Sequence, residues 1–360
     1  MKIGVIRQRY TPIGGAERYL DGLVREMTAR GHEVHVFANS WQSGAEGFTF
    51  HRVPMLRGSS FLKALSFAAN CKRVLAGAQC DRVFSMERTV RQDVYRAGDG
   101  CHREWLRQRA RFNSPLRQLS IAINPFHATM LSLERRMFTP QATARIIANS
   151  HRGKREIIDH YGYPPDRIHV IHNGVDCERF RPPAQKPASE RVRLLFVGTG
   201  FERKGLPFAI EALARLPPHI ELHVVGKGNI ARYQRLAGVT GAGDRVHFLG
   251  KDQDMPTLYQ RADVLVHPAI YEPFANVCME AMACGLPVVT SRINGVSEVI
   301  EPGKNGAIVE QPENIEALAA AIRPFLEPGA RQTAAIFARK TAEAYAIGPH
   351  ITETLRVITM

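Results

Sequence analysis

Apolar and polar positions along this chain of 360 residues follow a repeating order of strand, loop and helix. Lys2–Arg7 is a short apolar run, Tyr10–Gly15 is a loop with proline and glycine, and Ala16–Ala29 has apolar residues at helical spacing. Gly31 ends this helix, and alternating residues up to Phe37 predict the next strand. Later strands are expected at Asp81–Ser85 and Ala144–Ala148. Strands that alternate with helices predict a parallel, doubly wound sheet.

The same order begins again after a segment that has the composition of a linker. Asn173–Pro187 is dense in proline, glycine and charge, which favours an irregular connection. Beyond it, the loop Gly198–Gly205 and the helix Leu206–Leu216 follow an apolar strand. The strands expected in this half are Arg193–Val197, Glu221–Val225, Val246–Leu249, Val264–His267 and Val288–Thr290. The chain is therefore predicted to form two Rossmann-like α/β domains.

Length and composition agree with two domains. About two domains are expected for 360 residues, and 44% of the residues are apolar, which is enough for two cores. We place an N-terminal domain at 1–172, a linker at 173–190 and a C-terminal domain at 191–345.

Two carboxylates eight residues apart give the clearest chemical signal. Glu272 precedes an apparent helix start, and Glu280 lies about two turns further along. Pro273 suits the first helical position, where its missing N–H has no cost. The amides expected to point out of this helix N-terminus, a ready anion site, are those of Phe274, Ala275 and Asn276. An anion between two carboxylates that bind hydroxyl groups describes a nucleotide sugar. The alternative is an amphipathic helix with solvated glutamates.

A second signal places adjacent cations in a glycine-containing loop after Val197. Gly198 and Gly205 enclose this loop, and glycine lets a backbone turn tightly and approach a ligand. Arg203 offers a planar fork for phosphate oxygens, and Lys204 adds a mobile point charge. We expect this pair to neutralise the charge on a departing nucleoside diphosphate. A solvated basic turn is the alternative.

A third signal, Gly14-Gly15, stands at the start of the first helix. Such a pair lets backbone amides face a cleft between domains, although Gly-Gly turns are common. A further pair, Asn173-Gly174, is expected to form a turn rather than to take part in the chemistry.

Together these motifs resemble a known family. Glu-x7-Glu followed by Ala-Met-Ala-Cys-Gly-Leu-Pro-Val-Val is similar to the donor-site signature of the retaining glycosyltransferases of family 4. The adjacent Arg203-Lys204 matches one branch of that family, and the resemblance is strongest over residues 145–310. It implies the GT-B fold, in which two doubly wound parallel-sheet domains face a cleft. It also implies that a last helix, about 346–360, crosses back to the first domain with a kink at Gly348-Pro349.

The resemblance implies roles for the residues of the donor site. Glu272 would hold hydroxyls of the donor hexose, and Glu280 would bind the ribose diol. Arg203 and Lys204 would stabilise the leaving diphosphate, assisted by the helix N-terminus, while Gly14, Gly15 and Gly198 bring backbone close to the donor. The departing phosphate oxygen would accept the acceptor's proton. Neither a general base nor a metal or other cofactor is expected.

A loop in the first half resembles one subgroup of the family. Asp93-Val-Tyr-Arg-Ala-Gly-Asp99 is similar to the corresponding part of the lipopolysaccharide-core heptose glucosyltransferases. Asp99 is therefore a catalytic candidate near the donor sugar or the acceptor hydroxyl, with His102 as a second candidate and a plain loop aspartate as the alternative. Tyr19 stands where that subgroup can have an acidic residue, which leaves the acceptor open.

The expected reaction is transfer of a hexose, glucose from UDP-glucose, to a glycolipid of the lipopolysaccharide inner core. A GT-B nucleotide-sugar epimerase and transfer to another polysaccharide or lipid are the alternatives. A dinucleotide oxidoreductase is discounted, because Val197-Gly-Thr-Gly lacks the third glycine at the right spacing.

Positive charge is concentrated in the first half. Residues 1–185 contain 29 Lys and Arg against 16 acidic residues, and residues 186–360 contain 19 against 18. Ten arginines and no lysine lie between Arg88 and Arg136, interleaved with aromatic and aliphatic residues. This pattern is typical of an amphipathic helix on anionic lipid, and a basic helix packed on the sheet is the alternative. Nucleic acid is not an expected partner, because no RNA motif or recognition-helix pattern is present.

Nothing in the sequence predicts export or a membrane span. The apolar run Ile3–Ile6 is too short for a signal peptide, and no run approaches the ~18 apolar residues of a membrane span. The six cysteines form no Cys-x-x-Cys pair and are expected to be reduced, mostly buried thiols. We therefore expect a cytoplasmic protein, peripheral on the inner face of the cytoplasmic membrane.

Overall fold

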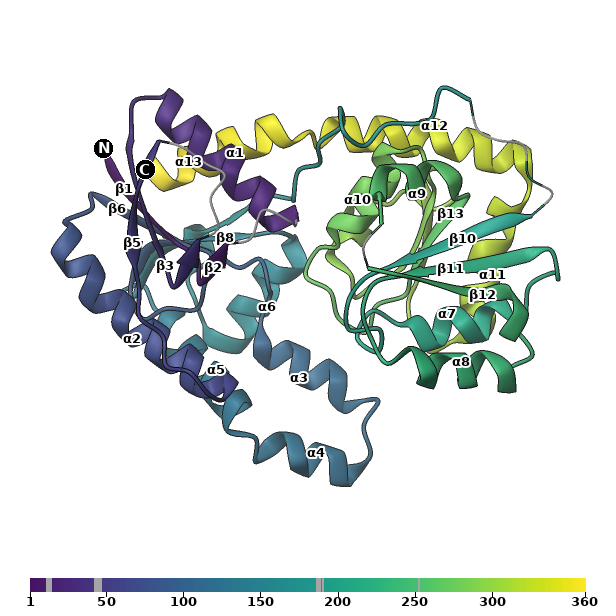
Figure 1. Cartoon of the computed structure of the whole chain (residues 1–360), viewed down its shortest axis with the longest axis horizontal. Coiled ribbons are helices and arrows are strands. Elements are labelled where there is room, and N and C mark those ends of the chain that lie inside the picture. The colour runs from purple at the N-terminus through teal and green to yellow at the C-terminus, as the bar shows by residue number, and fades with distance from the viewer. Residues whose placement is uncertain (11–14, 42–46, 186–188, 190, 252) are drawn as a thin grey trace. The chain divides into compact units, whose positions relative to one another are not determined.

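The computed structural model describes residues 1–10, 15–41, 47–185, 189, 191–251 and 253–360. The chain divides into two compact units, each with its own parallel sheet (Figure 1). Unit 1 comprises Met1–His172 and Gly348–Met360, and unit 2 comprises Asn173–Ile347. The C-terminal residues thus belong to the unit with which the chain begins.

Seven described strands form the sheet of unit 1 in the order β5-β3-β1-β6-β7-β8-β9, and neighbouring strands are parallel. Their bounds are β1 (Lys2–Ile6), β3 (Glu33–Ala38), β5 (Phe48–Arg52), β6 (Arg82–Ser85), β7 (Gln92–Arg96), β8 (Thr143–Ala148) and β9 (Ile168–Val170). A separate parallel pair consists of β2 (Arg9–Tyr10) and β4 (Ser40–Trp41). Ile3, Val5 and Ile6 of β1 are fully buried, as expected for a parallel strand that is covered on both faces.

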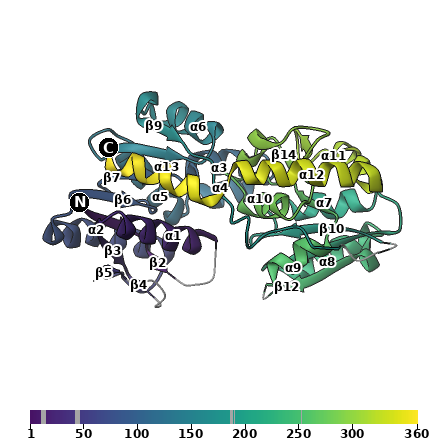
Figure 2. The same cartoon turned by 90° about the horizontal axis from the view of Figure 1, so that it is seen from above.

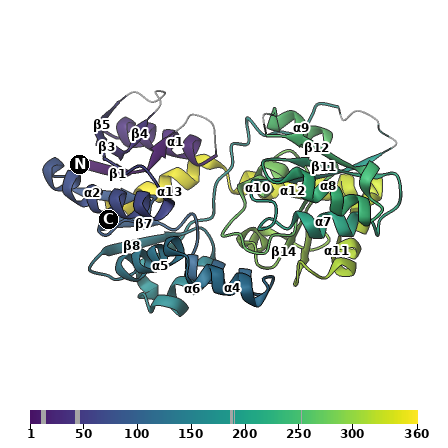
Figure 3. The same cartoon turned by 60° about the horizontal axis from the view of Figure 1, so that its bottom comes forward.

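The helices of unit 1 are α1 (Gly15–Ala29), α2 (Ser60–Ala78), α3 (His102–Ala110), α4 (Pro115–Ala122), α5 (Pro125–Met137), α6 (His151–Tyr161) and α13 (Ile347–Thr359). Figure 3 shows β3, β4 and β5 with α1 at one side of the unit, and β8 with α5 and α6 at the other. Helix α13 packs beside α1, where the rings of Tyr19 and His350 lie 5.0 Å apart (Figure 2). The last helix therefore completes the covering of unit 1.

Six described strands form the sheet of unit 2 in the order β12-β11-β10-β13-β14-β15, again with parallel neighbours. They are β10 (Val192–Val197), β11 (Ile220–Val225), β12 (Val246–Gly250), β13 (Val264–His267), β14 (Val288–Ser291) and β15 (Gly306–Val309). The helices are α7 (Leu206–Leu213), α8 (Ile230–Val239), α9 (Met255–Arg261), α10 (Asn276–Ala283), α11 (Ile315–Ile322) and α12 (Pro328–Ala344).

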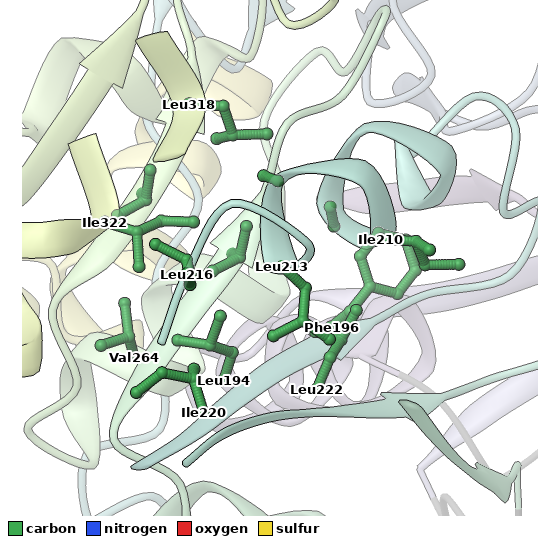
Figure 4. Close-up of a cluster of buried hydrophobic side chains, with 14 of the residues drawn as sticks. Leu194, Phe196, Ile210, Leu213, Leu216, Ile220, Leu222, Val264, Leu318 and Ile322 are labelled. Carbon is green, nitrogen blue, oxygen red and sulfur yellow. The ribbon is translucent and has the colours of Figure 1, made fainter. Parts of the chain in front are cut away.

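Strand β10 has a hydrophobic core on each of its faces. Leu194 and Phe196 pack on one face with residues of α7 and α11, such as Leu213 (Figure 4). Leu195 and Val197 pack on the other face with residues of α10 and α12. This division follows from the alternation of side chains along a strand. Because helices cover both faces, the loops at the carboxyl edge of the sheet remain as the place for a ligand.

The predicted architecture of two Rossmann-like parallel sheets is confirmed. The expected kink at Gly348-Pro349 lies a few residues earlier, because α12 ends at Ala344 and α13 begins at Ile347. The amide of Val175 donates to the carbonyl oxygen of Tyr345, and the amide of Ile347 donates to that of Val175, each at 2.9 Å. This pairing interrupts the helix, whereas proline is tolerated in the first turn of the next one.

Candidate functional site

The carboxyl ends of β10 and β13 carry the two loops that contain the predicted donor residues. The strands are neighbours in the sheet, and residues 198–205 and 268–275 follow them. The amide of Ile270 in one loop donates to the carbonyl oxygen of Arg203 in the other at 2.9 Å. Ligands of open α/β sheets bind at this edge, so the topology places Arg203, Lys204 and Glu272 where a substrate is expected.

Two glycines let the chain pack closely here. Gly205 has φ +80°, and a Cβ atom on it would lie 1.9 Å from the carbonyl oxygen of Pro268, so a larger residue would separate the loops. A Cβ atom on Gly198 would lie 3.2 Å from Cγ of Lys204. Gly198, a predicted donor-binding residue, thus leaves room for the aliphatic stem of Lys204.

Glu272, Arg203 and Lys204 form one ion-pair cluster. Oε2 of Glu272 accepts hydrogen bonds from Nη1 of Arg203 at 2.8 Å and from Nζ of Lys204. Burial alone would raise the pKa of the Glu272 carboxyl, but Lys204 and Arg203 outweigh it and lower the pKa to about 2. The carboxylate is therefore ionised, and the cluster has one net positive charge. The Arg203 side chain is 34% exposed, so it is the member that a phosphate can reach most directly.

The start of α10 differs from the prediction. The helix begins at Asn276 with Ala275 as its N-cap, so the expectation that Pro273 occupies the first helical position was wrong. The backbone of Glu272 pairs with the segment after β14, since the amide of Gly295 donates to the Glu272 carbonyl oxygen at 2.9 Å. This pairing keeps the chain out of the helix until Asn276.

The correction changes which predicted amides can face an anion. Phe274 lies before the helix, and the amide of Ala275 donates to Oδ1 of Asn294 at 3.2 Å. Asn276 supplies the first amide of α10, and its side-chain oxygen accepts from Nδ2 of Asn173 at 2.7 Å. Of the three predicted amides, only that of Asn276 belongs to the helix.

Glu280 lies within α10, on the same face as Asn276 one turn earlier. The hydroxyl group of the buried Tyr259 donates to Oε2 of Glu280 at 2.9 Å. Glu280 is partly exposed, so its carboxylate is held by Tyr259 and still accessible. This arrangement suits the predicted ribose contact, which stays a prediction.

Three buried polar residues at this site were not selected from the sequence. Asn294 accepts from the amide of Ala275 and donates to Oγ1 of Thr290 at 3.0 Å, which joins the start of α10 to β14. Asn173, interpreted as a turn residue, also holds α10. His267 is fully buried at the end of β13, and burial, then Lys204, lowers its pKa to about 3, so the ring is neutral. The sequence signals that could have found them are the Asn-Gly pairs after strands, at Asn173 and Asn294, and a histidine as the last residue of a strand, at His267.

Among the predicted residues of unit 1, Asp99 is held less firmly than the residues around Glu272. Asp99 lies in the turn after β7, its side chain is 75% exposed, and Oδ2 is 3.8 Å from Nη1 of Arg88. His102 is the first residue of α3, and Nε2 of its ring lies 2.9 Å from Nδ1 of His127. Gly15 is the first residue of α1, and Gly14 lies outside the described residues.

A buried carboxylate that the sequence analysis missed organises the region around Asp99. Glu134 of α5 is fully buried and accepts from Nε of Arg88 at 3.0 Å, from the amide of His102 at 2.6 Å and from the hydroxyl of Tyr161 at 2.5 Å. Arg88 in turn donates to the carbonyl oxygen of Gly100 at 2.8 Å. The turn that carries Asp99 is thus fixed through Arg88 and Glu134.

The fold and the matches to family models together define a class of protein. Residues 13–179 match the family "Glycosyltransferase Family 4", and residues 178–342 match "Glycosyl transferases group 1". The chain belongs to the glycosyltransferases of the GT-B fold, and the resemblance to family 4 is confirmed.

One relative matches nearly the whole chain. The lipopolysaccharide glucosyltransferase WaaG of Escherichia coli K12 is 28% identical over 335 residues, which cover 88% of this chain and 87% of WaaG. A crystal structure of WaaG, described as a glycosyltransferase involved in lipopolysaccharide biosynthesis, has a TM-score of 0.85 at 26% identity, with 99% of each chain covered. The structure of Anabaena HepE in complex with UDP and glucose shares the fold, with a TM-score of 0.75 at 23% identity over 99% of each chain.

Among the described residues, no helix is both long and apolar enough to cross a membrane. All six cysteines are free, four of them buried and two partly buried, as expected from their spacing.

Proposed function

We propose that this glycosyltransferase moves glucose, with retention of configuration, from UDP-glucose to a glycolipid of the lipopolysaccharide inner core. The observation that carries the proposal is the cluster of Glu272 with Arg203 and Lys204 at the carboxyl edge of the unit 2 sheet. WaaG, which is similar over nearly the whole chain, is a lipopolysaccharide glucosyltransferase by name. That likeness supports both the hexose and the class of acceptor.

Each member of the donor site has a role in this proposal. Arg203 and Lys204 bind the diphosphate and stabilise the charge that develops on it as the glycosidic bond breaks. Glu272, released in part from the cations by the bound phosphate, accepts hydrogen bonds from hexose hydroxyls. Glu280 binds the ribose diol while Tyr259 keeps its carboxylate oriented.

The remaining steps follow from the same cations. The leaving phosphate oxygen takes the proton of the attacking hydroxyl on the same face of the sugar, which gives retention without a general base. Arg203 and Lys204 supply the positive charge, so no metal or other cofactor is required in this proposal. We assign the acceptor to unit 1, with Asp99 as the residue that orients its hydroxyl.

The test is hydrolysis and transfer over a panel of UDP-, GDP- and ADP-linked hexoses, with and without lipopolysaccharide core acceptors. We expect UDP-glucose to be turned over fastest and the sugar to be transferred only when the core acceptor is present. NMR of the product should show that the anomeric configuration of the sugar is unchanged. Epimerisation of the donor without an acceptor would favour the isomerase instead. Equal rates with all three nucleotides would contradict the assignment of UDP.

We further propose that unit 1 docks on anionic lipid at the inner face of the cytoplasmic membrane through α4 and the end of α3. Helix α4 has no buried residue, and its apolar side chains are open to solvent: Leu116 is 82% exposed, Leu119 60% and the adjoining Ile123 74%. Arg109, Arg111 and Arg117 lie in the same segment. Exposed aliphatic residues next to arginines suit the boundary between headgroups and acyl chains.

Vesicle binding tests this surface. Each cationic residue near an anionic surface contributes about 1 kcal/mol, so replacing Arg109, Arg111 and Arg117 by Gln should weaken binding by about 100-fold. Arg107 is left unchanged because it pairs with the buried Glu104 at 2.8 Å and 2.9 Å. The control variant makes the same change of charge elsewhere in unit 1, at the exposed Arg25, Arg73 and Arg155.

The two triple variants separate a local surface from a general charge effect. Binding to anionic vesicles should survive in the control variant, be weak for neutral vesicles, and fall as salt shortens the screening length below ~10 Å. Equal binding of both variants, or of both kinds of vesicle, would defeat the proposal. Hydrolysis of soluble donor should stay unchanged in both variants.

A further inference from the structure

Three side chains at the far end of the unit 2 sheet form a group that plays no part in the proposed function. Glu221 and His223 are on β11, and His247 is on β12 directly opposite His223 in the register. Side chains two residues apart on a strand point to the same face, so all three converge. Glu221 is the second residue of β11, so the group lies toward the amino end of the sheet, away from the loops after β10 and β13.

The separations within this group fit one metal ion. Nε2 of His247 lies 3.4 Å from Oε1 of Glu221, and Nε2 of His223 lies 3.6 Å from Oε2. One ligand atom from each of the three residues can be chosen so that all lie within 4.8 Å of one another. Bonds of about 2.0–2.1 Å in a tetrahedral site place ligand atoms roughly 3.3 Å apart, which small side-chain rotations would reach here.

The chemistry of the three groups is also that of metal ligands. Burial, and to a lesser extent the nearby His247, lowers the pKa of His223, so its imidazole is neutral and has a lone pair at neutral pH. Burial would raise the pKa of Glu221, but Arg191 and His247 outweigh it and lower the pKa, so the carboxylate is ionised. Two imidazoles and one carboxylate, with solvent in the fourth position, are a common set for Zn²⁺ and neighbouring transition metals.

An arginine now neutralises the carboxylate. Nη1 of Arg191 donates to Oε1 of Glu221. The Arg191 side chain is 61% exposed, whereas that of Glu221 is 10% exposed, so the arginine can leave the pair by turning into solvent. The side chain of His247 is 39% exposed, which gives an ion a path into the group. A divalent cation would replace Arg191 as the partner of Glu221.

We propose that Glu221, His223 and His247 bind one divalent transition metal ion of the Zn²⁺ class. The ion would join β11 to β12, the edge strand of this sheet, and thereby stabilise unit 2. It would have no part in the transfer reaction, since the cluster of Glu272, Arg203 and Lys204 follows other strands at the opposite edge. The proposal is independent of the donor and of the acceptor.

Cobalt titration tests the site directly. Full-length protein without an affinity tag is treated with a chelator and titrated with Co²⁺, whose visible absorption reports tetrahedral coordination by nitrogen and oxygen. We expect one Co²⁺ per chain, its displacement by Zn²⁺, and a higher melting temperature with either ion. Absence of saturable binding with one ion per chain would overturn the proposal.

Variants connect the bound ion to these residues. His223→Ala and His247→Ala should each lower the affinity at least tenfold, because the loss of outer partners of a ligand already costs that much. His219→Ala, an exposed histidine two residues before Glu221, is the matched control and should leave the affinity unchanged. Arg191→Gln should bind the ion several-fold more tightly, because the competing guanidinium is gone.

The Arg191→Gln variant keeps all three ligands, so its result tests the proposal even if the histidine variants misfold. Unchanged affinity in His223→Ala and His247→Ala, or an equal loss in His219→Ala, would show that other histidines take the ion. Unchanged or weaker binding in Arg191→Gln would contradict the exchange of arginine for metal. Hydrolysis of the donor should be the same with and without the ion.

Discussion

Glu272 and Asp99 are both predicted catalytic carboxylates after strands of a Rossmann-like sheet, yet their surroundings differ sharply. Glu272 is 9% exposed and hydrogen-bonded by Arg203 and Lys204, which the sequence analysis selected with it. Asp99 is largely exposed and lies 3.8 Å from Arg88. The firm partner of Arg88 is the buried Glu134, which was not selected.

The two units differ in whether the charged groups proposed to act on the substrate also stabilise the local structure. In unit 2, the groups proposed to act on the substrate are also those that hold the local structure together. In unit 1, Arg88 and Glu134 hold the structure, and Asp99 stands outside them. Substitutions should therefore disturb function and stability together in unit 2 but separately in unit 1.

The largest expected effect is on the stability of unit 1. Arg88→Ala leaves Glu134 buried without its guanidinium, and loss of one partner from a buried ion pair costs about 3–5 kcal/mol of unfolding free energy. Both tryptophans, Trp41 and Trp105, are in unit 1, so tryptophan fluorescence in denaturant follows this unit alone. Arg91 is exposed, so Arg91→Ala is the control. Similar small losses of unfolding free energy in both variants would show that Arg88 does not stabilise unit 1.

The counterpart in unit 2 is an effect on turnover. Lys204→Ala removes one of the two cations proposed to stabilise the leaving diphosphate, and turnover at saturating donor should fall by about 10²–10³. The exposed Lys304→Ala, which loses only a surface pair with Glu301, should keep normal turnover. A Lys204→Ala enzyme with near-normal turnover would break the assignment of the leaving-group site.

A smaller effect concerns nucleotide affinity. Glu280→Ala should weaken UDP binding by roughly 1.5–3 kcal/mol, the range for a hydrogen bond to a charged group, as measured by calorimetry. Tyr259→Phe removes only the hydrogen bond that orients Glu280, so its effect on affinity should be smaller. The ribose assignment fails if UDP affinity is unchanged in Glu280→Ala.

The pKa of Glu272 predicts how its contribution depends on pH. The value of about 2 in the folded protein lies below the ordinary 4.5, so ionised Glu272 stabilises the fold above about pH 4.5, and this contribution is lost as the pH falls toward 2. The difference in unfolding free energy between the wild type and Glu272→Gln should be constant from about pH 5 to pH 8 and shrink below pH 4.5. A difference that grows in acid would have the wrong sign.

The smallest expected effect is the stability change of Asp99→Ala. An exposed side chain with one distant ion-pair contact should contribute less than about 0.5 kcal/mol. Transfer to acceptor should nevertheless fall if Asp99 orients the acceptor hydroxyl, with hydrolysis of the donor less affected. A large loss of stability would show that the two carboxylates are more alike than their exposure indicates.

The sequence predicted much of the fold because apolar periodicity is a local property. The strands around Leu194 and Leu265 were found, as was the loop with adjacent Arg203 and Lys204. The short strand β7 was not, since Gln92–Arg96 has only two adjacent apolar residues between polar ones and shows neither a long apolar run nor strict alternation. Long-range partners were also missed, because no local pattern shows that Asn294 would meet Ala275, or that Glu134 would meet Arg88.

Because the chain is synthesised from its N-terminus, the late position of α13 determines when unit 1 can be completed. Six of its residues are buried, and they belong to the unit that starts at Met1: His350, Ile351, Thr354, Leu355, Val357 and Ile358. A ribosome that has finished residue 172 must still add roughly 190 residues, which takes about 10–40 s at ordinary rates. During that time the face of α1 that carries Tyr19 and Gly22 lacks the helix that packs against it. Unit 1, although its larger part is synthesised first, can therefore be completed only after the residues of unit 2 have been made.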